Sequence, residues 1–216
     1  MGAGPHVEAV NVGGATPVAA KSGRTGIDKR PVDGPVRVEA PGPGGSGLAG
    51  DAIVDARHHG GGDKAVYAYA REDLDRWAAT LGRVAPGTFG ENLTLSGVDV
   101  TGARIGERWR VGRSLVLQVT LPRVPCATFS AHLGRERWID TFTRAALPGA
   151  YLRVVEPGEV RAGDPVVVVQ RPEHDVTVGL AFRALTGEPE LLPRLLDAPE
   201  LPGDLRENVS RRVGAG

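Results

Sequence analysis

Residues 115–126 read Leu-Val-Leu-Gln-Val-Thr-Leu-Pro-Arg-Val-Pro-Cys, a strand-forming run that ends in two prolines and a thiol. Aliphatic and β-branched residues dominate the first six positions, which is typical of a β-strand. Cys126 therefore follows directly after the end of a predicted strand. Because prolines restrict the backbone, this segment is suited to presenting a nucleophile or a metal ligand rigidly.

Cys126 is the only cysteine among the 216 residues. It cannot form an intramolecular disulfide or join a multi-cysteine metal cluster. A lone cysteine is more often a small buried hydrophobic residue than a reactive group. Arg123 supports a reactive Cys126, because a nearby guanidinium stabilises the thiolate that attacks electrophiles and binds metals. Both interpretations stay open on this segment alone.

The composition predicts one compact domain, or one domain with a small appendage. Lys plus Arg and Asp plus Glu both number 26, so the formal net charge is zero. This balance argues against a nucleic-acid partner, which is bound largely by neutralising phosphates. No apolar run approaches the roughly 20 residues that cross a bilayer, and the N-terminus lacks a secretory pattern. We therefore expect no membrane partner and a cytoplasmic location.

The 31 glycines and 17 prolines are spread along the chain, with short β-branched segments between them. This pattern predicts a mainly-β fold with tight turns, hence a barrel or a sandwich. Strands are expected at residues 6–12, 35–40, 51–56, 91–95, 108–111, 114–120, 151–155 and 165–170, with the last two paired through a turn at Gly163-Asp164. Helices are expected at residues 71–81 and 138–146.

Helical patterns replace the strands after Pro172. The first begins at Asp175, a residue type suited to an N-cap, and ends at Gly187. Two more short helices are expected at residues 190–196 and 204–213. We therefore predict a β domain over residues 1–172 and a three-helix appendage over residues 173–216, which is too small for a core of its own and should pack on the β domain.

The segment Lys21-Ser-Gly-Arg-Thr-Gly-Ile-Asp-Lys-Arg30 carries four cationic groups in a predicted loop. Cations, hydroxyls and exposed backbone N–H groups together suit a phosphate. A solvated turn is the alternative.

Two histidines precede three glycines in Arg57-His-His-Gly-Gly-Gly-Asp-Lys64. Neighbours on an extended chain point to opposite faces, and no third ligand has convincing spacing, which argues against a zinc site. The glycines allow a ligand to approach the backbone closely.

Glu91 and Asn92 are neighbours at a predicted strand start, in the segment Gly87-Thr-Phe-Gly-Glu-Asn-Leu-Thr94. Two interpretations stay open: these side chains bind a ligand, or they cap a turn. No Gly-rich nucleotide loop and no Gly-x-Ser-x-Gly motif is present, so neither a dinucleotide fold nor serine catalysis is indicated.

The order of these motifs is more specific than any one of them. Lys-Ser, then His-His-Gly-Gly-x-Asp-Lys-Ala-Val, then Gly-x-Phe-Gly-Glu-Asn-Leu, then Pro-Arg-x-Pro-Cys resembles the MOSC domain. That family is named after the C-terminal part of molybdenum cofactor sulfurase. The helical tail makes the chain more similar to the short bacterial YiiM-like branch. The resemblance runs from about residue 6 to residue 213.

The resemblance implies a MOSC-type β-barrel with a molybdenum cofactor site at one end. Cys126 matches the family's cysteine ligand to the metal, and thiolate is a fitting donor for molybdenum already bound by sulfur. By the same resemblance or by proximity to its motifs, the cofactor-binding residues are Lys21, Ser22, Lys29, Arg30, His58, His59, Asp63, Lys64, Glu91, Asn92 and Arg123. The Gly-rich stretch 41–50 matches no family motif and receives no role.

Relatives in this branch reduce N-hydroxylated compounds such as hydroxylaminopurines and amidoximes, so the resemblance implies a molybdenum-dependent reductase. One cysteine excludes an iron–sulfur cluster within this chain, and no flavin fingerprint is visible. The electrons should therefore come from a separate flavoprotein or ferredoxin-type reductase. Pyridoxal phosphate is not expected, because the chain is too short to include the lyase-type domain of larger fusions.

Two other functions stay open. Cys126 could carry a persulfide in a sulfur-transfer protein. Alternatively, the chain could be a non-catalytic cofactor or anion binder.

Overall fold

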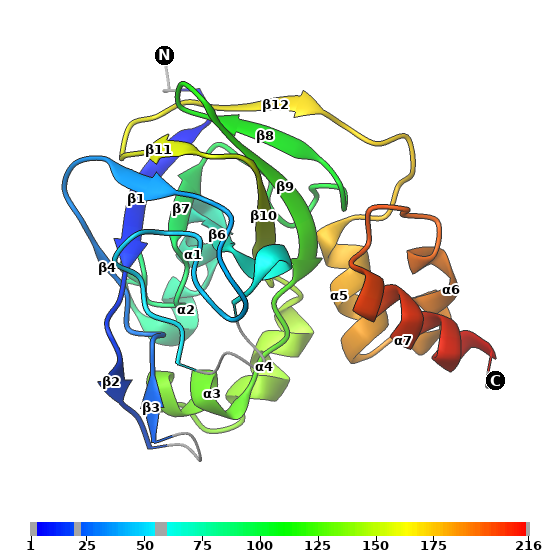
Figure 1. Ribbon diagram of the computed structural model, residues 1–216. Helices are drawn as coiled ribbons and strands as arrows, with labels where there is room; N and C mark the ends of the chain where they lie inside the picture. The colour runs from blue at the N-terminus through cyan, green and yellow to red at the C-terminus, as the bar shows by residue number, and fades with distance from the viewer. Residues whose placement is uncertain (1–3, 20–22, 55–59, 215–216) are drawn as a thin grey trace.

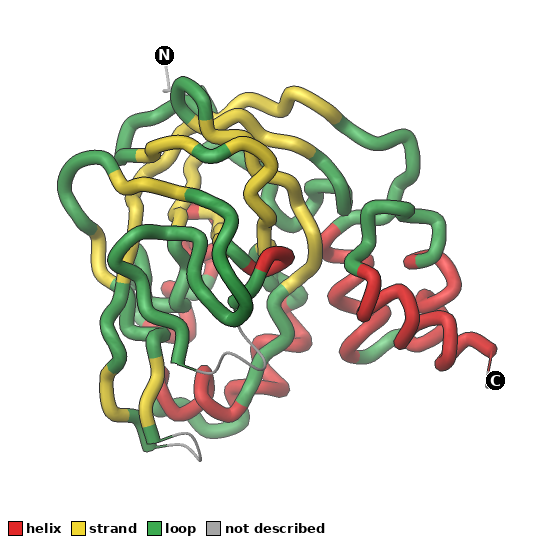
Figure 2. Tube along the Cα trace, viewed as in Figure 1, coloured by secondary structure: helices red, strands yellow, loops and turns green. Residues whose placement is uncertain are grey.

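The computed structural model describes residues 4–19, 23–54 and 60–214, which form a mainly-β body with helices on two sides (Figures 1 and 2). The strands are β1 His6–Val12, β2 Thr16–Pro17, β3 Arg24–Thr25, β4 Arg30–Pro31, β5 Val36–Val38, β6 Val66–Ala70, β7 Leu93–Ser96, β8 Arg108–Val111, β9 Leu115–Pro122, β10 Ala150–Glu156, β11 Gly158–Val160 and β12 Val166–Gln170. The α-helices are α1 Arg71–Arg76, α2 Ala78–Leu81, α3 Ala127–Leu133, α4 Trp138–Ala145, α5 Val178–Thr186, α6 Leu192–Leu195 and α7 Gly203–Gly214. The short 3₁₀ helices are η1 Gly62–Lys64 and η2 Pro189–Leu191.

Eight strands form one mixed sheet in the order β12-β8-β9-β10-β6-β7-β1-β4. Its neighbours pair antiparallel except β6 and β7, which are parallel. The predicted mainly-β character is confirmed, but the closed barrel is wrong. The sheet curls until residues 5–7 meet residues 163–166 through the His6–Pro165 bridge and three backbone hydrogen bonds. This contact is too short to be a strand ladder, so β12 and β4 are the two ends of the sheet among the described strands.

The predicted pairing of residues 151–155 with residues 165–170 is also wrong. β10 pairs with β9 and β6, whereas β12 pairs with β8. The connection contains β11, which leaves the main sheet and pairs with β5. A short spacing in sequence suggested a hairpin, but long-range partners determined the strand order.

Several boundaries differ from those expected. The helix over residues 71–81 divides at Trp77 into α1 and α2. Of the strand predicted over residues 51–56, residues 51–54 form no strand, and residues 55 and 56 lie outside the described residues. Sequence reasoning missed β6, whose five residues are all buried. Its Val-Tyr-Ala-Tyr-Ala sequence lacks the polar–apolar alternation of a half-exposed strand, as expected for a strand covered on both faces.

The C-terminal helices are present and lie to one side of the sheet (Figure 1). The N-cap of α5 is Thr177, whose hydroxyl accepts a hydrogen bond from the Leu180 N–H at 3.1 Å. The predicted cap, Asp175, instead pairs with Arg194 at 2.6 Å. No described helix is both long and apolar enough to cross a membrane. The domain boundary at residue 172 stays a prediction.

Two hydrophobic clusters organise the interior. The larger is mostly aliphatic and joins the inner side of the sheet to buried residues of α5, α6 and α7. The other contains every aromatic residue of the chain except Trp109. Its rings include Phe129, at the centre of α3, and Tyr67, in β6. This aromatic cluster lies directly behind the pocket described next.

Candidate functional site

A pocket opens beside the end of β9 and holds about 640 Å³ of empty space, counting its opening to solvent. Among the described residues it is lined by Arg24, Thr25, Gly26, Ile27, Lys29, Ala52, Ile53, Val54, Gly60, Lys64, Tyr67, Gly90, Asn92, Arg123, Cys126, Thr128 and Tyr151. Segments far apart in the sequence thus meet at one cavity.

Cys126 lies at this pocket and is partly exposed. Its backbone is extended, with φ −137° and ψ 168°, and α3 begins at the next residue. The thiol therefore lies between the end of β9 and the start of α3, a helix that the sequence did not predict. Partial exposure in a pocket excludes the interpretation of Cys126 as a fully buried, inert hydrophobic residue.

Arg123 is buried next to the thiol segment, with 4% of its surface exposed. Its guanidinium carbon lies 4.2 Å from the Phe129 ring centre and 5.3 Å from that of Tyr67. One terminal nitrogen, Nη1, donates to the Phe89 carbonyl. The Nε atom is buried and has no hydrogen-bond partner among the described residues. A buried donor without a partner is costly, so placing Arg123 here lowers the stability of the fold.

The surroundings of Arg123 also favour its charge. Burial alone would lower its pKa, but the interactions with Tyr151, Tyr67 and Cys126 outweigh this and raise the pKa of Arg123. The guanidinium therefore stays cationic, and an anionic group beside it is stabilised.

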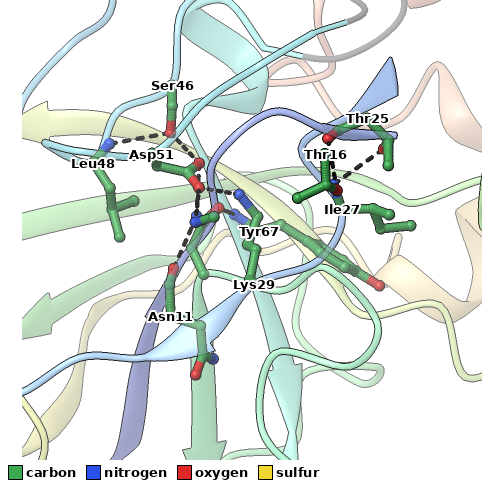
Figure 3. Close-up of polar contacts among 11 residues, drawn as sticks. Asn11, Thr16, Thr25, Ile27, Lys29, Ser46, Leu48, Asp51 and Tyr67 are labelled. Atoms are coloured by element: carbon green, nitrogen blue, oxygen red, sulfur yellow. Dashed lines mark hydrogen bonds and ion pairs between the residues drawn. The ribbon is translucent and has the colours of Figure 1, made fainter. Parts of the chain in front are cut away.

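Lys29 is the second buried cation of the pocket, with 6% of its surface exposed. Its Nζ forms an ion pair with the Asp51 carboxylate, whose side chain is fully buried. Burial lowers the pKa of Lys29, and the Asp51 charge offsets part of that effect. Figure 3 shows Asp51 between Lys29 and Ser46.

Asp51 accepts three further hydrogen bonds, from Gly13 N–H at 3.0 Å, Ser46 Oγ at 2.7 Å and Asn92 Nδ2 at 3.0 Å. Its carboxylate is therefore fully engaged in holding the loops together. Its hydrogen bonds and its ion pair with Lys29 therefore join four separate segments of the chain.

Asn92 lines the pocket and joins Asp51 to β6. Its Oδ1 accepts from the Tyr67 N–H at 3.0 Å, and its own N–H donates to the Tyr67 carbonyl at 2.7 Å. Asn92 thus fixes the backbone of Tyr67, whose ring packs against Arg123.

Glu91 does not line the pocket, although it adjoins Asn92. Its buried carboxylate accepts from Gly87 N–H at 2.6 Å, Phe89 N–H at 3.0 Å and Thr94 Oγ1 at 2.9 Å. Burial raises the pKa of Glu91. The carboxylate shapes the loop whose Phe89 carbonyl holds Arg123, so it acts on the pocket through that loop.

The glycines of this loop are required by close packing. At Gly87, with φ +84°, a Cβ would lie 2.4 Å from the Lys29 carbonyl oxygen; at Gly90, with φ +76°, it would lie 2.7 Å from the Ile27 side chain. The loop therefore closes tightly over the segment that carries Lys29.

The remaining predicted site residues fall into three groups. Lys64 lines the pocket, with its Nζ 6.0 Å from the Tyr151 ring centre. Asp63 lies outside the lining and pairs with Arg153 at 2.7 Å, and Arg30 pairs with Asp28 at the surface at 3.2 Å. The four residues Lys21, Ser22, His58 and His59 lie outside the described residues.

Sequence reasoning missed Asp51, Tyr67 and Tyr151. Asp51 fell within a wrongly predicted strand, and both tyrosines lie in strands without a motif of their own. It also gave no role to the Gly-rich stretch 41–50. There Gly45 accepts a hydrogen bond from the Gly61 N–H at 2.9 Å, and a Cβ on Gly60 would lie 2.7 Å from the Gly45 carbonyl oxygen. This stretch therefore backs the glycine loop that forms one wall of the pocket.

The lining has a strong charge imbalance. It contains four cationic side chains, Arg24, Lys29, Lys64 and Arg123, and among the described residues no carboxylate lines it. Asp51 neutralises Lys29 from behind. Among the described residues the lining thus has more cations than carboxylates beside a single thiol, an arrangement suited to an anionic ligand.

The family model of the MOSC domain matches residues 55–167, which include Lys64, Asn92, Arg123 and Cys126. The chain belongs to the MOSC domain family. The resemblance inferred from the motif order is confirmed.

Individual relatives agree with this assignment. The MOSC chain is 33% identical over 160 residues to the protein YflK of Bacillus subtilis (strain 168), covering 74% of this chain and 70% of YflK. The crystal structure of YiiM from Geobacillus stearothermophilus superimposes with a TM-score of 0.77 at 26% identity, covering 97% of this chain and 99% of that one. A protein named reductase from Gibberella moniliformis (strain M3125 / FGSC 7600) is 27% identical over 180 residues, but the chain spans only 31% of its length.

Proposed function

We propose that this MOSC protein binds a molybdenum cofactor in the pocket and reduces N-hydroxylated compounds with electrons from a separate reductase. The observation that carries the proposal is the lining: four cations, no carboxylate among the described residues, and an accessible thiol. The residues fit the group. The cofactor is an anionic pterin phosphate whose metal takes one thiolate from the protein, and the pocket offers an excess of cations beside one thiol.

Within this proposal the pocket residues have separate tasks. Cys126 is the metal ligand, and Arg123 and Lys64 balance the negative charge of the cofactor. When bound, the cofactor supplies two-electron removal of an oxygen atom from nitrogen.

Other residues set the environment of the reaction. Ile27, Ile53 and Val54 give the pocket an apolar wall that excludes water and strengthens electrostatic interactions within it. Burial raises the pKa of Tyr151, so its phenol stays neutral at physiological pH and adds no negative charge beside the cofactor. The overall reduction consumes two electrons and two protons and converts N–OH to N–H with release of water.

The first test is Cys126→Ala in protein expressed in cells with an intact molybdopterin pathway. We expect the wild type to contain molybdenum by mass spectrometry of the metal and to reduce benzamidoxime with a chemical electron donor. Cys126→Ala should show background activity, whereas Ser130→Ala, on the exposed side of the same helix, should match the wild type. Full activity in Cys126→Ala would contradict the proposal.

A sulfur carrier is the second candidate, because the partial exposure of Cys126 also lets a persulfide form and transfer. Intact-protein mass spectrometry distinguishes the two functions. A stable gain of one sulfur atom on Cys126 in molybdenum-free protein would favour the carrier, whereas molybdenum retained only when Cys126 is present favours the reductase.

A further inference from the structure

A second surface with distinctive chemistry lies on the outer side of β8, β9, β10 and β12. On β8, Trp109 and Val111 are buried in the core, while Arg108 and Arg110 point to the other face. A groove on that face is lined by Arg108, Arg110, Arg113, Ser114, Val116, Val155, Glu156, Val169 and Gln170. It shares no lining residue with the thiol pocket.

The charge of this groove is not balanced within the described part of the chain. Arg108, Arg110 and Arg113 form no ion pair with any described residue, and Glu156 is the one carboxylate in the described lining. The Arg108 Nε atom is buried and has no hydrogen-bond partner in the part of the chain that the structure describes. Other arginines nearby are paired, as Arg171 is with Glu107 at 2.8 Å. Three guanidinium groups in one groove, none of them ion-paired with a described residue, attract carboxylates.

Exposed valines surround the same arginines. Val155, Val167 and Val169 are 36%, 43% and 45% exposed. Among the large hydrophobic side chains exposed in the described chain, only Val124 and Ile139 lie outside β10 and β12. A concentration of apolar side chains at one surface indicates a protein-binding site, and arginine is enriched in such interfaces.

The edge position of β12 leaves this surface accessible. β12 pairs with β8 on one side, and beyond Val166 no described strand pairs with its other side. Val167 stands opposite Arg110 across the β12–β8 ladder, so apolar and cationic groups are neighbours on one face.

We propose that this arginine–valine face (Arg108, Arg110, Arg113, Val155, Val167 and Val169) docks an acidic surface of a partner protein. The partner presents carboxylates to the guanidinium groups and apolar side chains to the valines. A second copy of this chain fits less well, because a two-fold contact would bring arginine against arginine. A nucleic acid has phosphates for the arginines but no apolar group for the valines.

The test uses a fluorescein-labelled peptide of alternating glutamate and valine as the probe, with fluorescence anisotropy as the readout. We expect saturable binding to the wild type that weakens as salt is added. The double variant Arg110→Glu/Arg113→Glu should weaken binding at least tenfold. The matched control Arg83→Glu/Arg144→Glu reverses two exposed arginines elsewhere and should bind as the wild type does.

Several results would overturn the docking proposal. These are absence of saturable binding, equal loss in the control variant, equal binding of a lysine–valine peptide, or tighter binding of a single-stranded oligonucleotide. Sedimentation could also show a dimer that Val167→Lys dissociates, which would assign the face to a second copy. Molybdenum content and benzamidoxime reduction should be unchanged in both double variants, so failure here is distinguishable from failure of the proposed function.

Discussion

Lys29 and Arg123 are both buried cations of one pocket, yet their surroundings differ. Lys29 is neutralised by Asp51, a carboxylate held by three other donors. Arg123 has two aromatic faces and the Phe89 carbonyl, but no carboxylate pairs with it among the described residues. Since an uncompensated buried charge costs stability, its presence beside a thiol is better explained by a ligand than by folding. Lys29 therefore supports the fold, and Arg123 serves the site.

The largest expected effect follows from breaking the neutralised pair. Asp51→Asn leaves Lys29 buried without its counter-charge, so we expect the free energy of unfolding in urea to fall by about 3–5 kcal/mol. The double variant Lys29→Met/Asp51→Leu removes both charges and should recover part of that loss. A loss below about 1 kcal/mol in Asp51→Asn would show that the pair is not the structural element described here.

The second prediction concerns Arg123 and uses inorganic phosphate as a simple anion. A ligand that binds only the native state raises its free energy of unfolding, by about 2.7 kcal/mol at a hundred times its Kd. We expect phosphate to raise the free energy of unfolding of the wild type and of the Lys29→Met/Asp51→Leu variant. The free energy of unfolding of Arg123→Met should stay almost unchanged when phosphate is added. Thermal unfolding with and without phosphate measures this. Equal stabilisation of Arg123→Met would remove the distinction between the two cations.

Glu91 extends the comparison to a buried acid that, unlike Asp51, accepts its hydrogen bonds from neutral groups. Burial raises the pKa of Glu91 above its ordinary value of 4.5. At pH values between 4.5 and the raised pKa, the native state binds more protons at Glu91 than the unfolded chain does. In that pH range Glu91 therefore makes the free energy of unfolding fall as the pH rises. In Glu91→Gln this contribution should be absent. Urea unfolding across the acid range checks it, and an identical pH profile in both proteins would contradict it.

The smallest effect is expected at the surface pair of Arg30 and Asp28, 3.2 Å apart and open to solvent. Arg30→Ala should change the free energy of unfolding by at most about 1 kcal/mol, because solvent and salt screen exposed pairs. Its phosphate response should equal that of the wild type. A phosphate response lost in Arg30→Ala would move the anion site away from Arg123 and toward the surface loop.

Much of this protein was predictable from local sequence. Strands β1 and β8 appear with the expected bounds, and α4 and the C-terminal helices lie near theirs, because side-chain periodicity reflects local burial. Strand order was not predictable in the same way. The 151–155 and 165–170 segments do not pair with each other, because β11 lies between them and pairs with β5. Neither the 151–155 segment nor the 165–170 segment contains a pattern that predicts this pairing.

The candidate site likewise contains some residues that the sequence predicted and others that it did not. The motifs predicted Lys64, Asn92 and Cys126, and proximity to the motifs added Lys29 and Arg123; the fold brings these five residues to one pocket. Glu91 carried the same kind of signal, yet it faces a loop instead of the cavity. Asp51 carried no signal, because its importance arises from donors on four separate segments.

The sequence by itself determined the family, the mainly-β character and the single thiol after β9, since motif order and residue type are properties of the chain. Only the tertiary structure decided that the sheet stays open and that Asp51 pairs with Lys29. It also decided that Arg123 keeps its charge uncompensated among the described residues. The physical reason is that electrostatic balance depends on which groups meet in a low-dielectric interior, and distant segments meet there only after the strands have found their order.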